Sequence, residues 1–223
     1  MIKIENIEVV GWESAIRGMR NPMNSWEKSD SGWRGEFYYY SGMPIIEIGP
    51  NDLELMMRLA KGGSTHAKYR RMIVCYLDVT APLYWWKEAD TYKIGTVANS
   101  CSTMHKIHAK EFVLDDFSHE HLIVHEPIPC TALSGQQFLQ GLLNALNHSR
   151  EMYLETKDKK WWWQMIQLLP SSYNQRRTLM VNYEVLSHMY HDRKEHKLDE
   201  WREFCEMIRT LPYSQIITLE ENK

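Results

Sequence analysis

The stretch LLPSSYNQRRTLMVNYEVLSHMYHDRK, residues 168–194, decides most of what the sequence indicates about the fold. A Leu-Pro-Ser step near its start ends the helical pattern before it, and the residues that follow predict a long helix over 173–193. From about residue 134 onwards the chain is predicted to be helical. The other helices expected in this part are 134–158, 160–168 and 198–210.

One narrow stripe of the predicted helix carries a polar residue at each end. Asn182, Leu186, Met189 and Arg193 share this stripe, because offsets of 4, 7 and 11 residues nearly complete whole helical turns. The two polar residues would lie roughly 16 Å apart along the axis. A buried Arg needs an anionic partner. A carboxylate of the chain and a bound phosphate both satisfy that need, and the spacing leaves the two open.

The first half of the chain has a mixed pattern. Residues 2–10 alternate as a strand does, and 69–80 is rich in β-branched and aromatic residues. Between them, 51–61 predicts a helix with Asn51 as N-cap, Glu54 completing a capping box, and a Gly-Gly pair at its end. Strands early and helices late predict an α+β fold. Also expected are a short helix at 14–21, an irregular segment at 22–47, a helix after Pro82 and short extended segments around 111–127.

Composition excludes several classes of protein. The 223 residues carry a formal charge of −3 with both signs spread along the chain, so no basic stripe predicts nucleic-acid binding. No apolar run has the length of a membrane span or a signal sequence, and the widely spaced cysteines indicate reduced thiols. We therefore expect a cytoplasmic protein without a membrane or nucleic-acid partner. The Trp161-Trp162-Trp163 tract predicts either a fully buried helix or a contact with another subunit. From the second possibility we expect an oligomer.

Familiar catalytic motifs do not occur in the sequence. There is no GxSxG elbow, Walker A motif or GxGxxG loop, which points away from hydrolases and kinases. His119, His121 and His125 share one face of a possible strand, where either a zinc site or solvated histidines fit the spacing. No second cluster of ligands matches them, so solvated histidines are the better interpretation and no metal is predicted.

In order and spacing, several segments together resemble the flavin-dependent thymidylate synthases, the thymidylate-synthase-complementing family. These are His66 before a strand, VTAPLYWWKEADTYK at 79–93, a Ser/Thr/Asn tract, the stretch 168–194 and a last helix with Glu200-Trp201. The resemblance spans roughly residues 50–210. It implies one α+β domain over 1–223 with an antiparallel sheet packed with long helices, and a homotetramer whose sites form between subunits.

The resemblance also implies an activity and its site. The chain would convert dUMP to dTMP with FAD as cofactor and methylene-tetrahydrofolate and NADPH as co-substrates. Arg193 matches the family's nucleotide-binding Arg and takes the catalytic role, while Asn182 and His66 match residues at the flavin. The remaining cofactor-site residues implied are Tyr92, Lys93 and His188. The substrate-binding residues implied are Glu88, Thr91, Asn99, Ser100, Cys101, Ser102, Thr103 and Arg193.

The sequence departs from the family's pattern at charged positions. The Arg-His-Arg signature falls on 91–93, where only Lys93 keeps a charge, and Glu184 stands where the family has Arg. Each missing guanidinium removes a charge-assisted bond of about 1.5–3 kcal/mol to a phosphate. Two alternatives therefore remain: a paralogue that makes another C5 modification of a pyrimidine nucleotide, and a non-catalytic protein that binds or sequesters a nucleotide.

Overall fold

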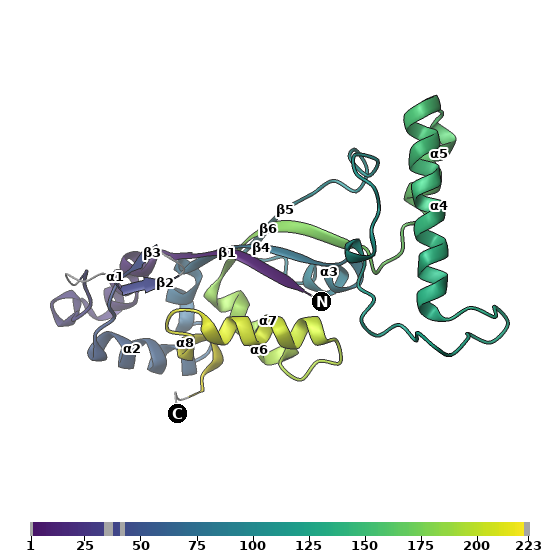
Figure 1. Ribbon diagram of the computed structural model, residues 1–223. Coiled ribbons are helices and arrows are strands. Elements are labelled where there is room, and N and C mark those ends of the chain that lie inside the picture. The colour runs from purple at the N-terminus through teal and green to yellow at the C-terminus, as the bar shows by residue number, and fades with distance from the viewer. Residues whose placement is uncertain (1, 34–37, 41–42, 221–223) are drawn as a thin grey trace. The chain divides into compact units, whose positions relative to one another are not determined.

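The computed structural model describes residues 2–33, 38–40 and 43–220 (Figure 1). The contacts within the chain divide it into two compact units. The first unit holds residues 80–88 and 100–176, and the second holds 2–79, 89–99 and 177–223. The prediction of a single domain over 1–223 stays a prediction.

The central element is a four-stranded antiparallel sheet with the strand order β1-β4-β6-β5. Most of it belongs to the second unit, and the division between the units falls inside three of its strands. Its strands are β1 (Lys3–Val10), β4 (Val74–Pro82), β6 (Asn174–Asn182) and β5 (Thr96–Ser100). This sheet, together with the helices, confirms the predicted α+β fold.

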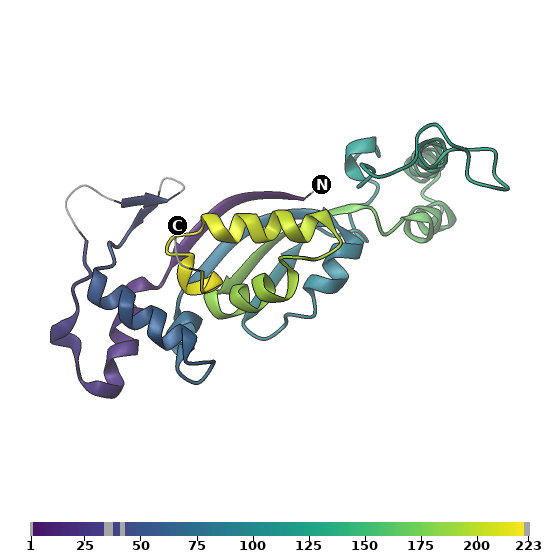
Figure 2. The same cartoon turned by 90° about the horizontal axis from the view of Figure 1, so that it is seen from below.

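One face of the sheet in the second unit is buried by helices. In β4, Cys75, Leu77 and Val79 alternate with exposed or half-buried residues, and Leu179 and Val181 do the same in β6. This period of two places all five side chains on the same face. Figures 1 and 2 show α6 (Tyr183–Arg193), α7 (Asp199–Thr210) and α8 (Gln215–Thr218) on one side of the strands.

The predicted helix over 173–193 is wrong in its first half. Residues 174–182 form β6, which lies between β4 and β5, and the helix begins only at Tyr183. Two adjacent arginines hide the alternation of the buried residues, so the strand has no clear signal in the sequence. Pairing with two neighbouring strands outweighs the weak local preference for a helix.

The first part of the second unit consists of helices and short strands. The strand expected at 69–80 is a 3-10 helix followed by β4. The segment expected to be irregular at 22–47 contains several short elements, and its residues 34–37 and 41–42 lie outside the described residues. The elements are α1 (Trp12–Arg20), η1 (Asn21–Met23), η2 (Trp26–Lys28), β2 (Tyr38–Tyr40), β3 (Met43–Ile45), α2 (Pro50–Lys61) and η3 (Ala67–Met72).

The N-terminus of α2 is capped from a distance. The prediction that Asn51 is the N-cap is wrong, because the N-cap position is occupied by Gly49, which has no side chain to accept a hydrogen bond. The carboxylate of Asp30 accepts instead from the backbone N–H groups of Asn51, at 2.9 Å, and Asp52, at 3.0 Å. The predicted end is confirmed, since Gly62 follows the last turn and donates to the carbonyl groups of that turn.

The first unit consists mainly of a helical hairpin, α4 (Gly135–Thr156) and α5 (Lys159–Leu168), which lie side by side in Figure 1. Ser134 caps α4 in a capping box with Gln137. The expected extended segments around 111–127 contain only the 3-10 turn η4 (Leu114–Asp116) and a bridge between Phe117 and Tyr173. The remaining helix, α3 (Leu83–Ala89), directly follows β4 as expected after Pro82.

The tryptophan tract on α5 does not form a fully buried helix. Trp163 is 43% exposed, with the Lys159 ammonium 5.8 Å from its ring centre, and only Met165 of this helix is buried. The interpretation as an internal helix is therefore wrong, and a contact with another subunit stays a prediction. Within the described residues, no helix combines the length and the apolar character that crossing a membrane requires.

Candidate functional site

The two ends of α6 place the two polar residues that the sequence singled out. Asn182 is the N-cap, and its side-chain oxygen accepts from the Val185 N–H at 3.0 Å. The turn before β5 passes directly over this residue. Gly95 has a φ of +81°, and a Cβ there would lie 2.5 Å from the Asn182 side-chain nitrogen, so only glycine fits. Asn182 therefore fixes where α6 starts.

Arg193, in the last turn of α6, is held by two aromatic residues. Its Nε donates to the Tyr92 hydroxyl at 3.0 Å, and its guanidinium carbon lies 5.7 Å from the Tyr92 ring centre. The ring centre of Trp201, a fully buried residue of α7, lies 5.0 Å from the same carbon. The Tyr92 hydroxyl donates in turn to the Asp192 carboxylate at 3.1 Å. We call these four residues the Arg193 cluster.

The protonation of Tyr92 fits this arrangement. Burial, together with the neighbouring Asp192 carboxylate, raises the pKa of Tyr92 above its ordinary value of 10, against the lowering effect of Arg193. The phenol is therefore neutral at physiological pH, and its hydroxyl donates a hydrogen bond to Asp192 and accepts one from Arg193. A neutral hydroxyl and two rings orient the guanidinium. Such a group suits a carbonyl or anionic oxygen of a ligand.

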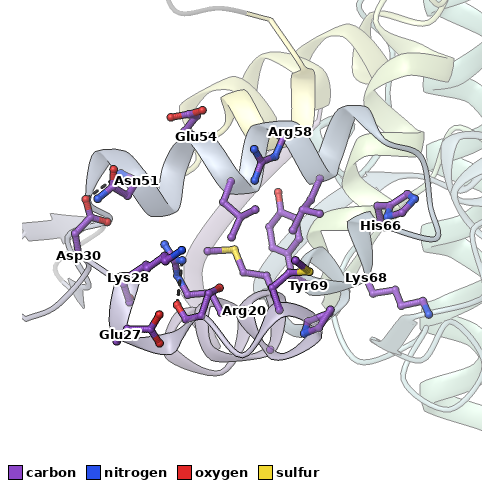
Figure 3. A pocket seen from close by; sticks show the side chains of 18 of the residues that line it. Arg20, Glu27, Lys28, Asp30, Asn51, Glu54, Arg58, His66, Lys68 and Tyr69 are labelled. Carbon is purple, nitrogen blue, oxygen red and sulfur yellow. Dashed lines mark hydrogen bonds between the residues drawn. The ribbon is translucent and has the colours of Figure 1, made fainter.

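His66 lines a separate large cavity in the second unit, formed by α1, α2 and the segments around η2 and η3 (Figure 3). The cavity has a volume of about 1060 Å³. Figure 3 shows His66 and Lys68 at one end and Lys28 at the other. Arg58 adds a further cation, and apolar side chains lie between these ends.

The lining of this cavity combines cations and apolar side chains with the carboxylates of Glu27, Asp30 and Glu54. Its volume is at the upper end of the range for ligand sites. Lys28, Arg58 and Lys68 offer donors to phosphates, and Leu55 and Leu59 offer apolar contact. A flavin dinucleotide would fit this volume, with its phosphates at the cations and away from these carboxylates.

Arg20 also lines the cavity but belongs to a structural network. It is 4% exposed, and its Nε donates at 2.6 Å to Asp52, which is completely buried. Burial opposes ionisation of Asp52, but hydrogen bonds from Ser31, Ser29 and Arg20 outweigh it and lower the pKa of this carboxyl. This network anchors the segment before β2 to α2.

The structure separates the residues predicted for the cofactor. Tyr92 and Asn182 make the contacts described above, Lys93 is exposed in the turn after α3, and His188 is exposed on α6. None of these four is among the described residues that line the cavity at His66. The predicted cofactor residues thus fall into two groups within the second unit.

Glu184, at a position where the resemblance leads one to expect Arg, has a structural partner. It is 4% exposed, and its two carboxylate oxygens bind the Nε and Nη2 atoms of Arg71 in η3. The Nη2 bond is 3.2 Å long. Glu184 thus joins α6 to η3.

The predicted substrate residues lie partly in each unit. Thr91 and Asn99 are exposed in the second unit, while Glu88 is half-buried in the first. The remaining ones form the segment 100–103 of the first unit, which continues the edge of the sheet. There the Cys101 backbone N–H donates to the Arg176 carbonyl at 2.9 Å, and the Ser102 hydroxyl accepts from two following N–H groups.

The histidine pattern at 119–125 does not form a metal centre. In the described ranges, no group of three or more His, Cys, Asp or Glu residues is arranged to hold a metal ion. His119 shares a hydrogen bond of 2.8 Å with the Phe117 carbonyl. All four cysteines are free thiols, with Cys101 and Cys130 exposed.

Sequence reasoning missed two members of the Arg193 cluster. Trp201 was part of the pattern that carried the resemblance, and its place in the apolar stripe of α7 marked it only as a core residue. Asp192 resembled an ordinary surface acid beside Arg193. For Asp192, the only signal was its position next to Arg193 in the sequence.

Comparisons with known proteins agree on the fold. No family model and no curated protein matches the sequence. Among solved structures, thymidylate synthase X from Helicobacter pylori with FAD and dUMP superposes with a TM-score of 0.65 at 16% identity, over 97% of this chain and 96% of that one. A second structure of that enzyme, also with FAD and dUMP, gives 0.63 at 16% identity over 95% and 96%.

A related fold occurs in a nucleotide methylase. The UMP/dUMP methylase PolB from Streptomyces cacaoi, bound with 5-Br dUMP, superposes with a TM-score of 0.59 at 14% identity, over 98% of this chain and 95% of that one. The chain therefore has the fold of the flavin-dependent thymidylate synthases.

Proposed function

We propose that the chain is a flavin-dependent enzyme that methylates a pyrimidine nucleotide at C5, converting dUMP to dTMP. Methylene-tetrahydrofolate would be the one-carbon donor and NADPH the reductant. The observation that carries this proposal is the Arg193 cluster, an oriented guanidinium at the end of α6. It supports the proposal because the same fold holds FAD and dUMP in thymidylate synthase X.

Arg193 takes the catalytic role in this proposal. Its guanidinium would bind a carbonyl oxygen of the pyrimidine and stabilise the negative charge that develops there when C5 reacts. The rings of Tyr92 and Trp201 keep it oriented before the substrate arrives, so little reorganisation is needed during the reaction. The fully buried Trp201 also keeps water from one face of the group.

The cavity at His66 is the site proposed for FAD. Lys28, Arg58 and Lys68 would hold the phosphates, and His66 would lie beside the ring system. When bound, reduced FAD supplies the reducing equivalents that the conversion of a methylene into a methyl group requires. Asn182 sets the start of α6, and through it the position of Arg193.

Further assignments belong to the same proposal. Lys93, Tyr92 and His188 are assigned to the cofactor, and Glu88, Thr91 and Asn99 to the substrate together with residues 100–103. The sites would be completed between subunits of a cytoplasmic homotetramer. The exposed Trp163 supports a contact between subunits, because large exposed aromatic residues are enriched at interfaces. The folding of 1–223 as one domain is part of this proposal.

One alternative has its own support. A paralogue that modifies C5 of another pyrimidine nucleotide agrees with the likeness to the UMP/dUMP methylase and with the exchange of charge at Glu184 and Arg71. Such an enzyme would bind a flavin and release the C5 proton of UMP faster than that of dUMP.

The test begins with the absorption spectrum of the purified protein with and without added FAD. We expect an oxidised-flavin band, followed by release of tritium from [5-³H]dUMP when the folate and NADPH are added. Tritium release from [5-³H]UMP alone would replace the first candidate with the second. A colourless protein that takes up no FAD but binds dUMP would overturn both and leave a nucleotide-binding protein.

A further inference from the structure

A second cavity in the second unit shares Arg20 and Ser29 with the cavity at His66. It has a volume of about 450 Å³, which is within the usual range for sites of small ligands. The methylation proposed above gives this cavity no role. We propose that it binds a flat aromatic acid, with the carboxylate of the ligand at Arg17 and its ring at Trp26. We call it the Arg17 cavity.

One face of α1 supplies the charged lining of the Arg17 cavity. Glu13, Ile16, Arg17 and Arg20 all line it, and offsets of 3, 4 and 7 residues place them on one side of the helix. Ile16 is 5% exposed, and Ile46, which directly follows β3, is 4% exposed. These two buried side chains give the cavity an apolar wall beside the charged groups.

Arg17 is not paired with the acid that its own helix offers. A Glu four residues before an Arg can pair with it along the helix surface. Here the Glu13 carboxylate accepts instead from the indole N–H of Trp33 at 2.6 Å. Within the residues that the structure describes, the Arg17 side chain makes no hydrogen bond or ion pair. The cavity therefore presents a cation that is available to an anionic ligand.

The charges in the lining favour a ligand with a single negative charge. Arg20 is 4% exposed, and its Nε donates at 2.6 Å to the buried Asp52, which compensates its charge. The charged side chains that remain in the lining are Glu13 and Arg17, which are separated by roughly 6 Å along the helix axis. A phosphate dianion at Arg17 would be repelled by Glu13 more strongly than a carboxylate.

Trp26 offers the ligand an aromatic surface. It lines the cavity and is 49% exposed, and its indole N–H donates to the side-chain oxygen of Asn21 at 2.8 Å. This bond holds the ring in one orientation although half of its surface meets water. Two aromatic rings in contact gain about 0.5–1.5 kcal/mol beyond the area that they bury. An aromatic acid uses both this surface and the unpaired cation.

Glu13 distinguishes one aromatic acid from another. The two charged positions on α1 are separated by about the length of a benzene ring that carries substituents at opposite ends. An amino group para to the carboxylate would therefore reach Glu13 while the carboxylate meets Arg17. We expect 4-aminobenzoate to be a better ligand than benzoate for this reason.

Calorimetric titration of the full-length protein tests the class of ligand. The probes are 4-aminobenzoate, benzoate, phenyl phosphate and the neutral 4-aminobenzamide. Of these four, 4-aminobenzoate should bind most tightly. The benzamide should bind about tenfold more weakly than 4-aminobenzoate, because it lacks the charge-assisted bond with Arg17. Phenyl phosphate should bind more weakly than benzoate.

Three variants test the residues of the site. Arg17→Gln should weaken 4-aminobenzoate by about 3- to 10-fold, the lower part of the range for a charge-assisted bond, because Arg17 is exposed to water. It should leave the affinity for 4-aminobenzamide unchanged, and Arg17→Lys should keep most of the affinity for the acid. The matched control is Arg202→Gln, which removes an exposed arginine of α7 outside the cavity and should bind all four probes as the wild type does.

Four outcomes would overturn the proposed site. They are equal affinities of the wild type for 4-aminobenzoate and 4-aminobenzamide, an Arg17→Gln protein that binds 4-aminobenzoate as the wild type does, tighter binding of phenyl phosphate than of benzoate, and no binding of any probe. Because Arg17 is exposed, its variants should fold, and circular dichroism checks this. The flavin spectrum and tritium release test the proposed function separately, so failure of one proposal leaves the other standing.

Discussion

An arginine, a tyrosine and a carboxylate meet in the Arg193 cluster and again in Arg209, Tyr190 and Glu220, which we call the Arg209 cluster. In both, Nε of an arginine donates to a tyrosine hydroxyl that donates to a carboxylate. In the Arg209 cluster, Glu220 also binds the guanidinium itself at 2.8 Å. In the Arg193 cluster, the buried ring of Trp201 lies against the guanidinium.

These contacts give the two arginines different surroundings. An ion pair with Glu220 compensates the charge of Arg209 and ties Glu220 to α7. The indole of Trp201 lies against the guanidinium of Arg193 and helps to orient it. The two clusters share α6, which carries Tyr190 and Arg193, so each variant in one cluster has a matched variant in the other.

The largest effect on stability is expected from removing the indole of Trp201, which belongs to the Arg193 cluster. Trp201→Ala removes a fully buried indole from the core of α7 and should lower the free energy of unfolding by about 3–5 kcal/mol. Urea denaturation measures this loss. Ile94→Ala, at a residue that is 92% exposed, should stay within about 0.5 kcal/mol of the wild type. Equal losses in the two variants would contradict the role of Trp201 in the core.

Replacing the two arginines tests the comparison directly. Arg193→Gln should weaken dUMP binding by roughly 10- to 150-fold, because a charge-assisted hydrogen bond contributes about 1.5–3 kcal/mol. Calorimetric titration measures the affinity. Arg209→Gln should leave the affinity unchanged and lower only the thermal stability. If both variants bind dUMP as the wild type does, Arg193 has no more contact with the nucleotide than Arg209.

Part of this arrangement could be predicted from the sequence. The helical stripe and the resemblance both identified Asn182 and Arg193, and the strand at 2–10 and the end of α2 at Gly62 follow from local pattern. Residues 174–182 could not be assigned correctly, because a strand in the middle of a sheet is decided by the strands on either side. The cap of α2 by Asp30 was hidden for the same reason, since the two lie about twenty residues apart in the sequence.

The partners of Arg193 were beyond sequence reasoning. Tyr92 stands 101 residues before it, and only the fold brings the two together. The sequence did indicate that an Arg on this stripe needs a partner, and it left a carboxylate and a phosphate open. The structure adds a third kind of partner, a neutral phenol backed by a ring, which the rule for buried charges does not anticipate.

The shared helix provides a smaller test. Asn182→Ala removes the side-chain cap of α6 and should lower the free energy of unfolding by about 1 kcal/mol. Asn182→Ser keeps an oxygen for the Val185 N–H and should recover most of that loss. Thermal unfolding monitored by circular dichroism compares the three proteins. A loss in Asn182→Ala that Ser does not recover would show that the close contact with Gly95 matters more than the cap.

The smallest effect separates the two clusters by pH. The hydrogen bond from Tyr190, together with Arg209 and Lys194, lowers the pKa of Glu220 below its ordinary value of 4.5, against a raising effect of burial. Because the folded state has the lower pKa, Glu220 contributes stability above about pH 4.5, and this contribution is lost as the pH falls through the folded pKa. The protection of the α8 amides against hydrogen exchange, measured relative to their intrinsic exchange rates at each pH, should therefore fall in acid, while Glu220→Gln should show a weaker dependence of protection on pH. In the Arg193 cluster, the pKa of the Tyr92 phenol is raised above 10, so its hydroxyl stays protonated from acidic to neutral pH. Protection at the end of α8 that is independent of pH below 4.5 in the wild type would show that the ion pair of Arg209 does not anchor Glu220 to α7.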